Sequence, residues 1–450
     1  MRLNSVKAVV LSMGLAIGVG ANAQQSLTLT LEDAVRIALS ENPTVKVADT
    51  EITKQEWAKK GTLSSLLPQV SFSAGYNRAL KKQVMYMGDM GDMFEGGDGG
   101  IEVGMDNTWA AGFSATLPLI NAQLWKQLSI SADDVELAVE KSRESRISMV
   151  SQVRQAYYAV LLAQASHKSL LENLDNSQKN YEDIDQKYKQ GLKSEYDVIR
   201  ADVAVKNVEP NLLDAENSIV LAKWQLKALT GIDLDTDITC TGSLDDYADS
   251  LCDTYMRIDT TAIAGNSSLR QLDLQERQLE KTRDVAKAAY YPSLNLSFDY
   301  QWTAMSNDFK FKDYKWNPYS TLGLTLSIPI FSGGNRYSTL KQSNIQLQQL
   351  ELNRQNTQRN LMVGVRQYLN SMRTGIKQYQ SADKSVDQAR KGYDIALKRY
   401  ETGSGTLLEV NDSQLALTQA QLNRSQAIYT YLVAKAQLDE TLGSETTNEK

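Results

Sequence analysis

The chain has 450 residues, of which 42% are hydrophobic and only 7 are proline, so long elements without a proline break are expected. Its formal net charge of -6 argues against a nucleic-acid partner, because nucleic acid selects basic surfaces. The single histidine, His167, falls inside a predicted helix, and no histidine pair, CxxC or serine-nucleophile motif is present. The sequence therefore favours a protein that is not an enzyme, with no cofactor and no metal site.

Residues 1–23 are typical of a secretory signal peptide. Arg2 and Lys7 supply positive charge, an apolar core covers residues 8–20, and "ANA" at residues 21–23 offers a small-residue cleavage site. No cysteine follows this site to carry a lipid, and no later run of about 18 apolar residues predicts a membrane-spanning helix. An exported chain of this kind is either soluble or a β-barrel.

The rest of the chain is an internal repeat. The stretch "ENPTVKVADTEI" aligns with "GNSSLRQLDLQE", and "LLPQVSFSAGY" aligns with "YYPSLNLSFDY". Further along, "VRQ" recurs and "KYKQG" aligns with "RYETG". We therefore expect two copies of one structural unit. The predicted divisions are a first repeat over 24–231, a linker over 232–265, a second repeat over 266–443 and a tail over 444–450.

Each repeat has the same predicted order of elements: a helix, a strand, a loop, a second strand and two further helices. The strands alternate apolar with small or polar residues, and about 10 residues suits a tilted strand crossing a bilayer, although half-buried strands of soluble proteins share this pattern. The long helices space their apolar residues by three and four, which is typical of coiled coils. The predicted helices are 43–67, 121–188, 194–230, 266–291, 332–400 and 405–441, and the predicted strands are 68–78, 108–119, 292–303 and 319–331.

Proline and glycine mark the predicted junctions between strands and helices. The stretch "LSIPIFSGGNRYS" has the strand, glycine turn and helix order of a phosphate-binding loop. Its first-repeat counterpart "TLPLINAQ" lacks the glycine pair, and a nucleotide-binding strand is apolar throughout, so we set the phosphate-binding interpretation aside. The predicted junction residues are Pro68, Pro118, Pro292, Pro329, Gly333 and Gly334.

The strand pairs and their loops favour part of a barrel. Residues 81–107 form a loop rich in Gly, Met and Asp, for which metal capture is a minor alternative, and residues 304–318 form the second loop. Long loops at one end of a strand pair are typical of the outward face of a barrel. Since membrane barrels start at about eight strands, the chain would need copies of itself, and two, three or four copies would give about eight, twelve or sixteen strands.

The predicted helix lengths give a geometric test. At 1.5 Å per residue, the two shorter helices of a repeat span about 37 Å and about 55 Å. Their combined length is close to that of the long helix, which spans roughly 100 Å. They would lie end to end along it, with the irregular linker as a belt at the middle. Cys240 and Cys252 fall in this linker, either as a local disulfide or as two unpaired thiols.

The signal peptide, "LTLEDAVRIALSENP", the two-fold repeat, "LSIPIFSGGNR" and "RYETGSGTLLEVNDSQ" together resemble the TolC-like outer-membrane efflux proteins across the mature chain. The resemblance implies a mainly α fold with a membrane β-barrel. In this fold a homotrimer forms a twelve-stranded barrel in outer-membrane lipid, and the barrel continues as a helical coiled-coil tunnel in the periplasm. It also implies an exit duct for efflux or type I secretion, with a periplasmic adaptor and an inner-membrane pump as partners. The alternative is an exported periplasmic coiled-coil scaffold without a channel.

The resemblance further implies a gate at the periplasmic end of the tunnel. The stretch "YETGSGTLLEVNDSQ" matches the acidic constriction of the family, which gives this role to Glu409 and Asp412, one helical turn apart on one face. Where the family has an arginine that latches the tip, this chain has Gly405.

The expected latch is therefore different here. Asp197 is the expected acidic partner, with Arg200 or Lys193 as the cation. Gly191 and Gly403, together with the glycine at 405, are expected at the tips of the helical hairpins, where an adaptor would make contact.

Overall fold

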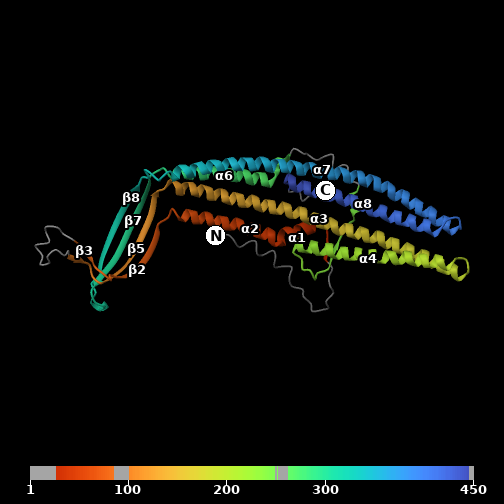
Figure 1. The fold of residues 1–450 in the computed structure, drawn as a ribbon, viewed down its shortest axis with the longest axis horizontal. Helices are drawn as coiled ribbons and strands as arrows, with labels where there is room; N and C mark the ends of the chain where they lie inside the picture. The colour runs from red at the N-terminus through yellow and green to blue at the C-terminus, as the bar shows by residue number, and fades with distance from the viewer. Residues whose placement is uncertain (1–26, 86–100, 249–250, 252–261, 445–450) are drawn as a thin grey trace, which may run out of the picture. The chain divides into compact units, whose positions relative to one another are not determined.

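The computed structural model describes residues 27–85, 101–248, 251 and 262–444 (Figure 1). The predicted signal peptide, most of the first predicted loop, Cys252 and residues 445–450 of the predicted tail lie outside the described residues. The chain divides into two compact units, and each takes segments from both halves of the sequence. Unit 1 comprises Met1–Val45, Arg146–Thr260 and Gly364–Lys450, and unit 2 comprises Lys46–Ser145 and Thr261–Val363.

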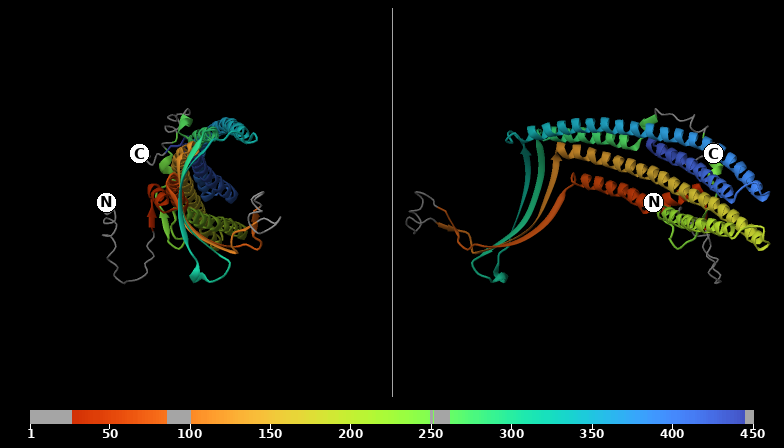
Figure 2. Two further views of the ribbon diagram at one scale, coloured as in Figure 1. Left: turned by 90° about the vertical axis from the view of Figure 1, so that its left-hand side faces the viewer. Right: turned by 45° about the vertical axis from the view of Figure 1, so that its right-hand side comes forward.

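Unit 2 contains a four-stranded antiparallel sheet in the order β2-β5-β7-β8. Two local hairpins, β2 with β5 and β7 with β8, are joined because β5 pairs with β7. Within the described residues, β2 and β8 are edge strands with one unpaired side each. Figure 2 shows that these strands are strongly bent and twisted. The strands are Gln69–Arg78 (β2), Asn107–Ile120 (β5), Ser293–Ser306 (β7) and Asn317–Ser327 (β8).

Large apolar side chains are exposed on the edge strands of this sheet. Phe72 on β2 is 58% exposed and Leu322 on β8 is 73% exposed. Small or polar residues alternate with them, as Ser71 and Gly323 do. Soluble monomers rarely leave a contiguous apolar patch of this kind open to water. The alternation predicted from the sequence therefore produces a sheet whose exposed apolar side chains need an apolar environment to cover them.

A second, smaller ladder lies beyond the first strand pair. β3 (Gln83–Met85) pairs in antiparallel fashion with β4 (Ile101–Val103), in a region that the sequence predicted as a loop without regular structure. Strands of three residues are too short to show alternation, so the pattern gave no signal for them.

The junctions between strands and helices include one correction. Pro118 was predicted at a junction, but it lies inside β5, and that prediction is wrong. β2 begins at Gln69, opposite Thr116, so the last part of β5 has a single partner strand and tolerates a residue without an N–H. The register also shifts between Pro118 and Ile120, as at a bulge. The residues that lie between a helix and a strand are Pro68, Pro292, Pro329, Gly333 and Gly334.

The turn from β8 into α7 (Asn335–Glu401) uses two consecutive glycines. Gly333 and Gly334 have φ values of 61° and 82°, in the left-handed region that favours glycine. β8 itself ends at Ser327, before Pro329, whereas the sequence predicted a strand to residue 331. Proline cannot donate to the ladder, which explains the earlier end.

Ion pairs and hydrogen bonds join α3 to α6 in unit 2. Lys281 Nζ lies 2.6 Å from Asp133 Oδ2, and Gln278 Nε2 donates to Asp134 Oδ1 at 2.8 Å. Burial, followed by the charge of Asp133, raises the pKa of Asp134. None of the described helices is long and apolar enough to cross a membrane. The helices that contribute to unit 2 are α2 (Pro43–Ser64), α3 (Ala122–Lys189), α6 (Ser267–Ala288) and α7.

Unit 1 contains short elements that the sequence did not predict. β1 (Leu27–Leu29) pairs in parallel with β6 (Ile238–Cys240), and α1 (Leu31–Glu41) follows β1 directly. Tyr157 on α3 is buried, and its hydroxyl donates to the carbonyl oxygens of Leu29 at 3.1 Å and Thr241 at 2.6 Å. Burial raises the pKa of Tyr157 to about 12. This buried tyrosine fixes the mixed region, which corresponds to the belt of the predicted fold, against the long helix.

Cys240 lies in β6 as a buried free cysteine of the described part of the chain. Burial raises the pKa of its thiol to about 11, so the thiol is protonated and weakly nucleophilic at neutral pH. Its predicted partner, Cys252, lies outside the described residues. The disulfide therefore stays a prediction.

Candidate functional site

Unit 1 contains two helical hairpins whose turns have the same structure. Gly191 has a φ of 77° in the first turn and Gly403 has a φ of 76° in the second. In both turns the N–H of the next residue donates to the carbonyl five positions earlier, at 2.8 Å. This is the Schellman arrangement, in which a left-handed glycine ends the helix. The hairpins join α3 to α4 (Glu195–Thr230) and α7 to α8 (Leu407–Leu442).

Each turn leads into its second helix through a capping box. Ser194 caps α4 by accepting from the N–H of Asp197, whose carboxylate accepts from the Ser194 hydroxyl at 2.8 Å. Thr406 and Glu409 make the corresponding capping box at α8. Asp197 and Glu409, both candidate gate residues, therefore occupy equivalent positions in the two hairpins, and each helps to begin its helix. Their negative charge also suits the positive end of the helix dipole.

Arg399 supplies a positive charge beside Glu409. Its Nη1 lies 3.5 Å from Glu409 Oε2, and its Nη2 donates to the carbonyl of Ser404 at 3.2 Å. Gly405 leaves room for this pair, because a Cβ there would lie 3.0 Å from both Arg399 Cβ and Glu409 Oε2. Sequence reasoning missed Arg399. The available signal was Lys398 and Arg399 in the last turn of α7, where the helix dipole favours cations.

Lys193 connects the two hairpins. Its Nζ lies 4.0 Å from the ring centroid of Tyr400 on α7. Tyr400 is only 7% exposed, so the aromatic side of this cation–π contact is shielded from water. Among the three candidate latch residues, Lys193 contacts the other hairpin, whereas the hydrogen bonds of Asp197 stay within the start of α4. Sequence reasoning did not single out Tyr400.

An apolar cluster packs the two hairpins together near their tips. Ile184 on α3 and Val410 on α8 are fully buried, and Tyr393 on α7 and Ala201 on α4 are buried with them. All four helices therefore contribute to one small core, and a change in the angle between the hairpins must disturb it. The other buried members are Ala396, Tyr400, Leu407 and Leu417.

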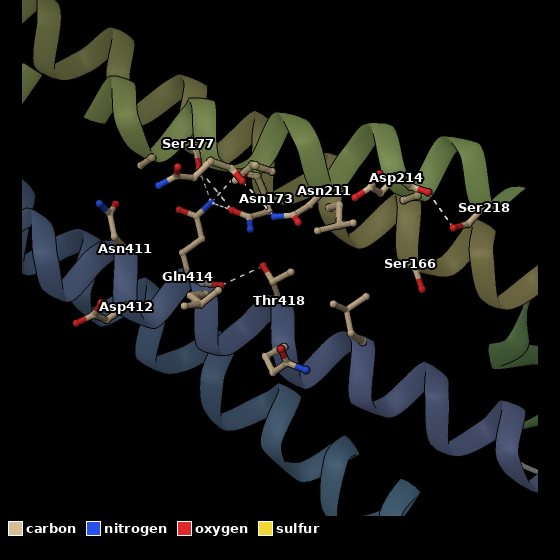
Figure 3. A pocket seen from close by; sticks show the side chains of 18 of the residues that line it. Ser166, Asn173, Ser177, Asn211, Asp214, Ser218, Asn411, Asp412, Gln414 and Thr418 are labelled. Carbon is tan, nitrogen blue, oxygen red and sulfur yellow. Dashed lines mark hydrogen bonds between the residues drawn. The ribbon is translucent and has the colours of Figure 1, made fainter. Parts of the chain in front are cut away.

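A cavity of 990 Å³ is lined by α3, α4 and α8 (Figure 3). Gln414 on α8 points into a polar group on α3, where its Nε2 donates to the carbonyl of Asn173 at 2.7 Å and to Ser177 Oγ at 3.1 Å (Figure 3). All three side chains are buried. These hydrogen bonds fix α8 against α3 and give the cavity one rigid polar wall.

The two candidate acidic residues have different surroundings. Asp412 and Arg200 line the cavity, and Asp412 is exposed without an ion pair to any described residue. Glu409 instead lies against its own turn, beside Arg399. Asp412 is therefore the carboxylate that is available to a cation, and Glu409 is the one that holds the tip.

No arrangement of histidine, cysteine, aspartate and glutamate that could hold a metal ion is found in the described residues. The loop segment 86–100, considered above for metal capture, lies outside them. His167 lies on α3, with its Nε2 3.6 Å from Glu216 Oε1 on α4.

Residues 34–232 and 260–444 match the family described as "Outer membrane efflux protein". Outer membrane protein TolC of Vibrio cholerae is 23% identical over 389 residues, which cover 85% of this chain and 83% of that protein. Alkaline protease secretion protein AprF of Pseudomonas aeruginosa is 23% identical over 430 residues, which cover 92% of this chain and 84% of that protein. The crystal structure of the CmeC outer membrane channel of Campylobacter jejuni has a TM-score of 0.72 at 20% identity, with 93% of this chain and 87% of that chain covered.

These comparisons confirm two predictions. The likeness to CmeC confirms the predicted fold class, and the family match confirms the resemblance that the sequence motifs indicated. The chain therefore belongs to the outer membrane efflux protein family, as an exit duct of the outer membrane with a periplasmic helical domain.

Proposed function

We propose that three copies of this chain close one twelve-stranded barrel, and that the paired hairpin tips form the gate of the tunnel below it. The observation that carries the shared barrel is the pair of open sheet edges, β2 and β8, next to exposed apolar side chains. The contacts at the two glycine turns support the gate.

The open edges support a barrel that is shared between copies. In lipid, each backbone N–H or C=O group without a hydrogen bond at a strand edge costs roughly several kcal/mol, because no water is present to bond to it. Pairing β8 of one copy with β2 of the next satisfies both edges at once. Three copies give twelve strands, an even number within the range of natural membrane barrels. Phe72 and Leu322 would then face lipid.

The names of the relatives support a role in export by a larger assembly. They include a protease secretion protein and a pyoverdine export outer membrane protein. We infer that this chain receives cargo from an inner-membrane pump through a periplasmic adaptor, and that the adaptor contacts the hairpin tips at Gly191, Gly403 and Gly405. A hairpin tip presents helix faces on which partner helices can pack. The chain acts as a conduit and performs no catalytic step.

The gate combines a charged mouth with two closing contacts. Three copies would set six carboxylates around the mouth, three from Asp412 that are open to cations and three from Glu409 that are paired with Arg399. A narrow opening lined by one sign of charge concentrates cations and excludes anions. The Lys193 contact with Tyr400 fixes one hairpin against the other, and the Arg399 pair with Glu409 fixes the α8 turn. Opening requires the hairpins to separate, which breaks the first contact.

The shared barrel is tested by extracting outer membranes in mild detergent and comparing boiled with unboiled samples on a gel. We expect a band near three times the 50.1 kDa chain that collapses on heating. A monomer or dimer that is absent from the membrane fraction would contradict the barrel and favour the coiled-coil scaffold. Conductance of the purified trimer in a planar bilayer then tests the gate separately.

A further inference from the structure

The loop between β7 and β8 has an unusual sequence. From Asn307 to Trp316 it reads "NDFKFKDYKW", in which aromatic residues alternate with lysines. We call this segment the basic aromatic loop. It lies at the end of the two strands opposite to their junctions with α6 and α7 (Figure 1). Neither the barrel nor the gate explains this composition.

Contacts between aromatic side chains give the loop a defined conformation. The Phe311 ring lies 5.5 Å from the Trp109 ring of β5 in an edge-to-face arrangement, 5.3 Å from the Tyr314 ring and 6.0 Å from the Trp316 ring, measured between centroids. Edge-to-face contacts at these distances are favourable. The loop therefore folds back over the end of the sheet and is anchored on β5.

The polar groups of the loop stay within it or contact the neighbouring strand. Asn307 Oδ1 accepts from the N–H of Asp106 at 2.9 Å, and Asn107 Nδ2 donates to the carbonyl of Asp308 at 3.3 Å. The Asp308 carboxylate accepts from Ser306 Oγ at 2.7 Å, and this hydrogen bond is the main reason that the pKa of Asp308 is lowered. Asp308 is thus used by the turn itself and does not neutralise the lysines through an ion pair.

The lysines, in contrast, are directed to the surroundings. Lys310, Lys312 and Lys315 are exposed, and none of them forms an ion pair with another described residue. The loop thus presents three exposed ammonium groups from a platform of packed aromatic rings, and with the carboxylates of Asp308 and Asp313 it keeps a net positive charge. Tyr and Trp rings favour the boundary between hydrocarbon and headgroups, and lysines beside them attract phosphate.

The position of the loop indicates which phosphate groups its lysines would meet. The helical domain is periplasmic, so the ends of β7 and β8 away from the helices face outward. The exposed apolar side chains of β8, such as Leu322, lead along the strand towards this end. At this level the loop would meet lipid headgroups, whose phosphates its lysines can attract. We propose that the basic aromatic loop binds the phosphorylated glycolipid headgroups of the outer leaflet.

The test uses purified full-length protein in mixed detergent micelles with three lipids: bis-phosphorylated lipid A, dephosphorylated lipid A and phosphatidylcholine. The amount of each lipid that remains bound after size exclusion is measured by mass spectrometry. The variant is K310Q/K312Q/K315Q. A matched control, K377Q/K384Q/K391Q, removes three exposed lysines from α7. A heated and unheated gel of each sample shows that the oligomer is intact, independently of lipid binding.

Wild type and control should retain bis-phosphorylated lipid A about tenfold better than the dephosphorylated form, and the loop variant should lose this preference. Three lysines at an anionic surface would give a preference of more than about tenfold without screening, and salt lowers it because the charges are exposed. Equal retention of the phosphorylated lipid by the loop variant would overturn the proposal, as would wild type without a phosphate preference.

Discussion

Replacing Lys193 by glutamine should open the gate. The ammonium group lies 4.0 Å from the centroid of the Tyr400 ring, and this ring is 7% exposed. A cation–π contact is worth about 0.5–1 kcal/mol at an exposed site and about 2 kcal/mol when desolvated. Because the ring is buried and the lysine is half-buried, we take about 1 kcal/mol per copy. Three copies then lose about 3 kcal/mol from the closed state, which shifts the open-to-closed ratio roughly a hundredfold.

The assay is the open probability of the reconstituted channel in a planar bilayer at fixed ionic strength. Lys193→Arg keeps a cation over the ring and should stay closed, which separates the contact from general damage to the tip. Tyr400→Leu should open the channel as Lys193→Gln does, and the double variant should add little. A Lys193→Gln channel with the open probability of the wild type would refute the reasoning, and so would single effects that simply add.

Three further predictions concern the charged mouth, the turns and the α3–α6 contact. Glu409→Gln with Asp412→Asn should reduce cation selectivity, seen as a reversal potential closer to zero in a salt gradient, and unchanged currents would contradict this role. Gly191→Val with Gly403→Val adds about 1–2 kcal/mol of backbone strain at each turn, so drug resistance should fall while the heat-sensitive oligomer band persists; unaffected resistance would count against the adaptor contact. Asp134→Asn should stabilise the chain at pH 7 more than at pH 4, because the raised pKa makes wild-type stability fall as pH rises from the ordinary value of 3.8 through the folded value. Thermal unfolding at both pH values measures this, and an equal shift at the two would argue against it.

The sequence predicted the regular elements well where their periodicity was long. The helix predicted over 121–188 is observed as Ala122–Lys189, and the helix predicted over 332–400 is observed as Asn335–Glu401. Such runs repeat one pattern many times, so noise at single positions matters little. The parallel pair β1–β6 carries no such signal, because each strand has three residues and the partners are distant in sequence. Pro118 was misplaced because β5 tolerates a proline there only as β2 begins opposite Thr116, which the pairing alone reveals.

The candidate site was predictable in its positions but not in its contacts. Glycine spacing located both turns, and the family resemblance pointed to Glu409. The cation beside Glu409 is Arg399 of the preceding helix, and the residue under Lys193 is Tyr400 of the other hairpin. Both contacts depend on how helices are folded back on one another, and a linear pattern does not encode this geometry. Gly405 was identified from the sequence only as the position where the family has an arginine, whereas in the structure its lack of a side chain leaves space for Arg399.

The central ladder of the sheet sets an order of folding. Phe113 of β5 pairs with Tyr300 of β7, about 190 positions later along the chain, whereas β2–β5 and β7–β8 are local hairpins. Contacts over such separations form late, because the closure of a long loop costs entropy before the contact is gained. The two hairpins can form as each half of the chain is exported, but their seam must wait for the second half. Until then the two edges of the β2–β5 hairpin are open to the periplasm, where they can template aggregation. A nascent chain of this design therefore depends on a holding factor, or on rapid delivery to the membrane, during the interval between its two halves.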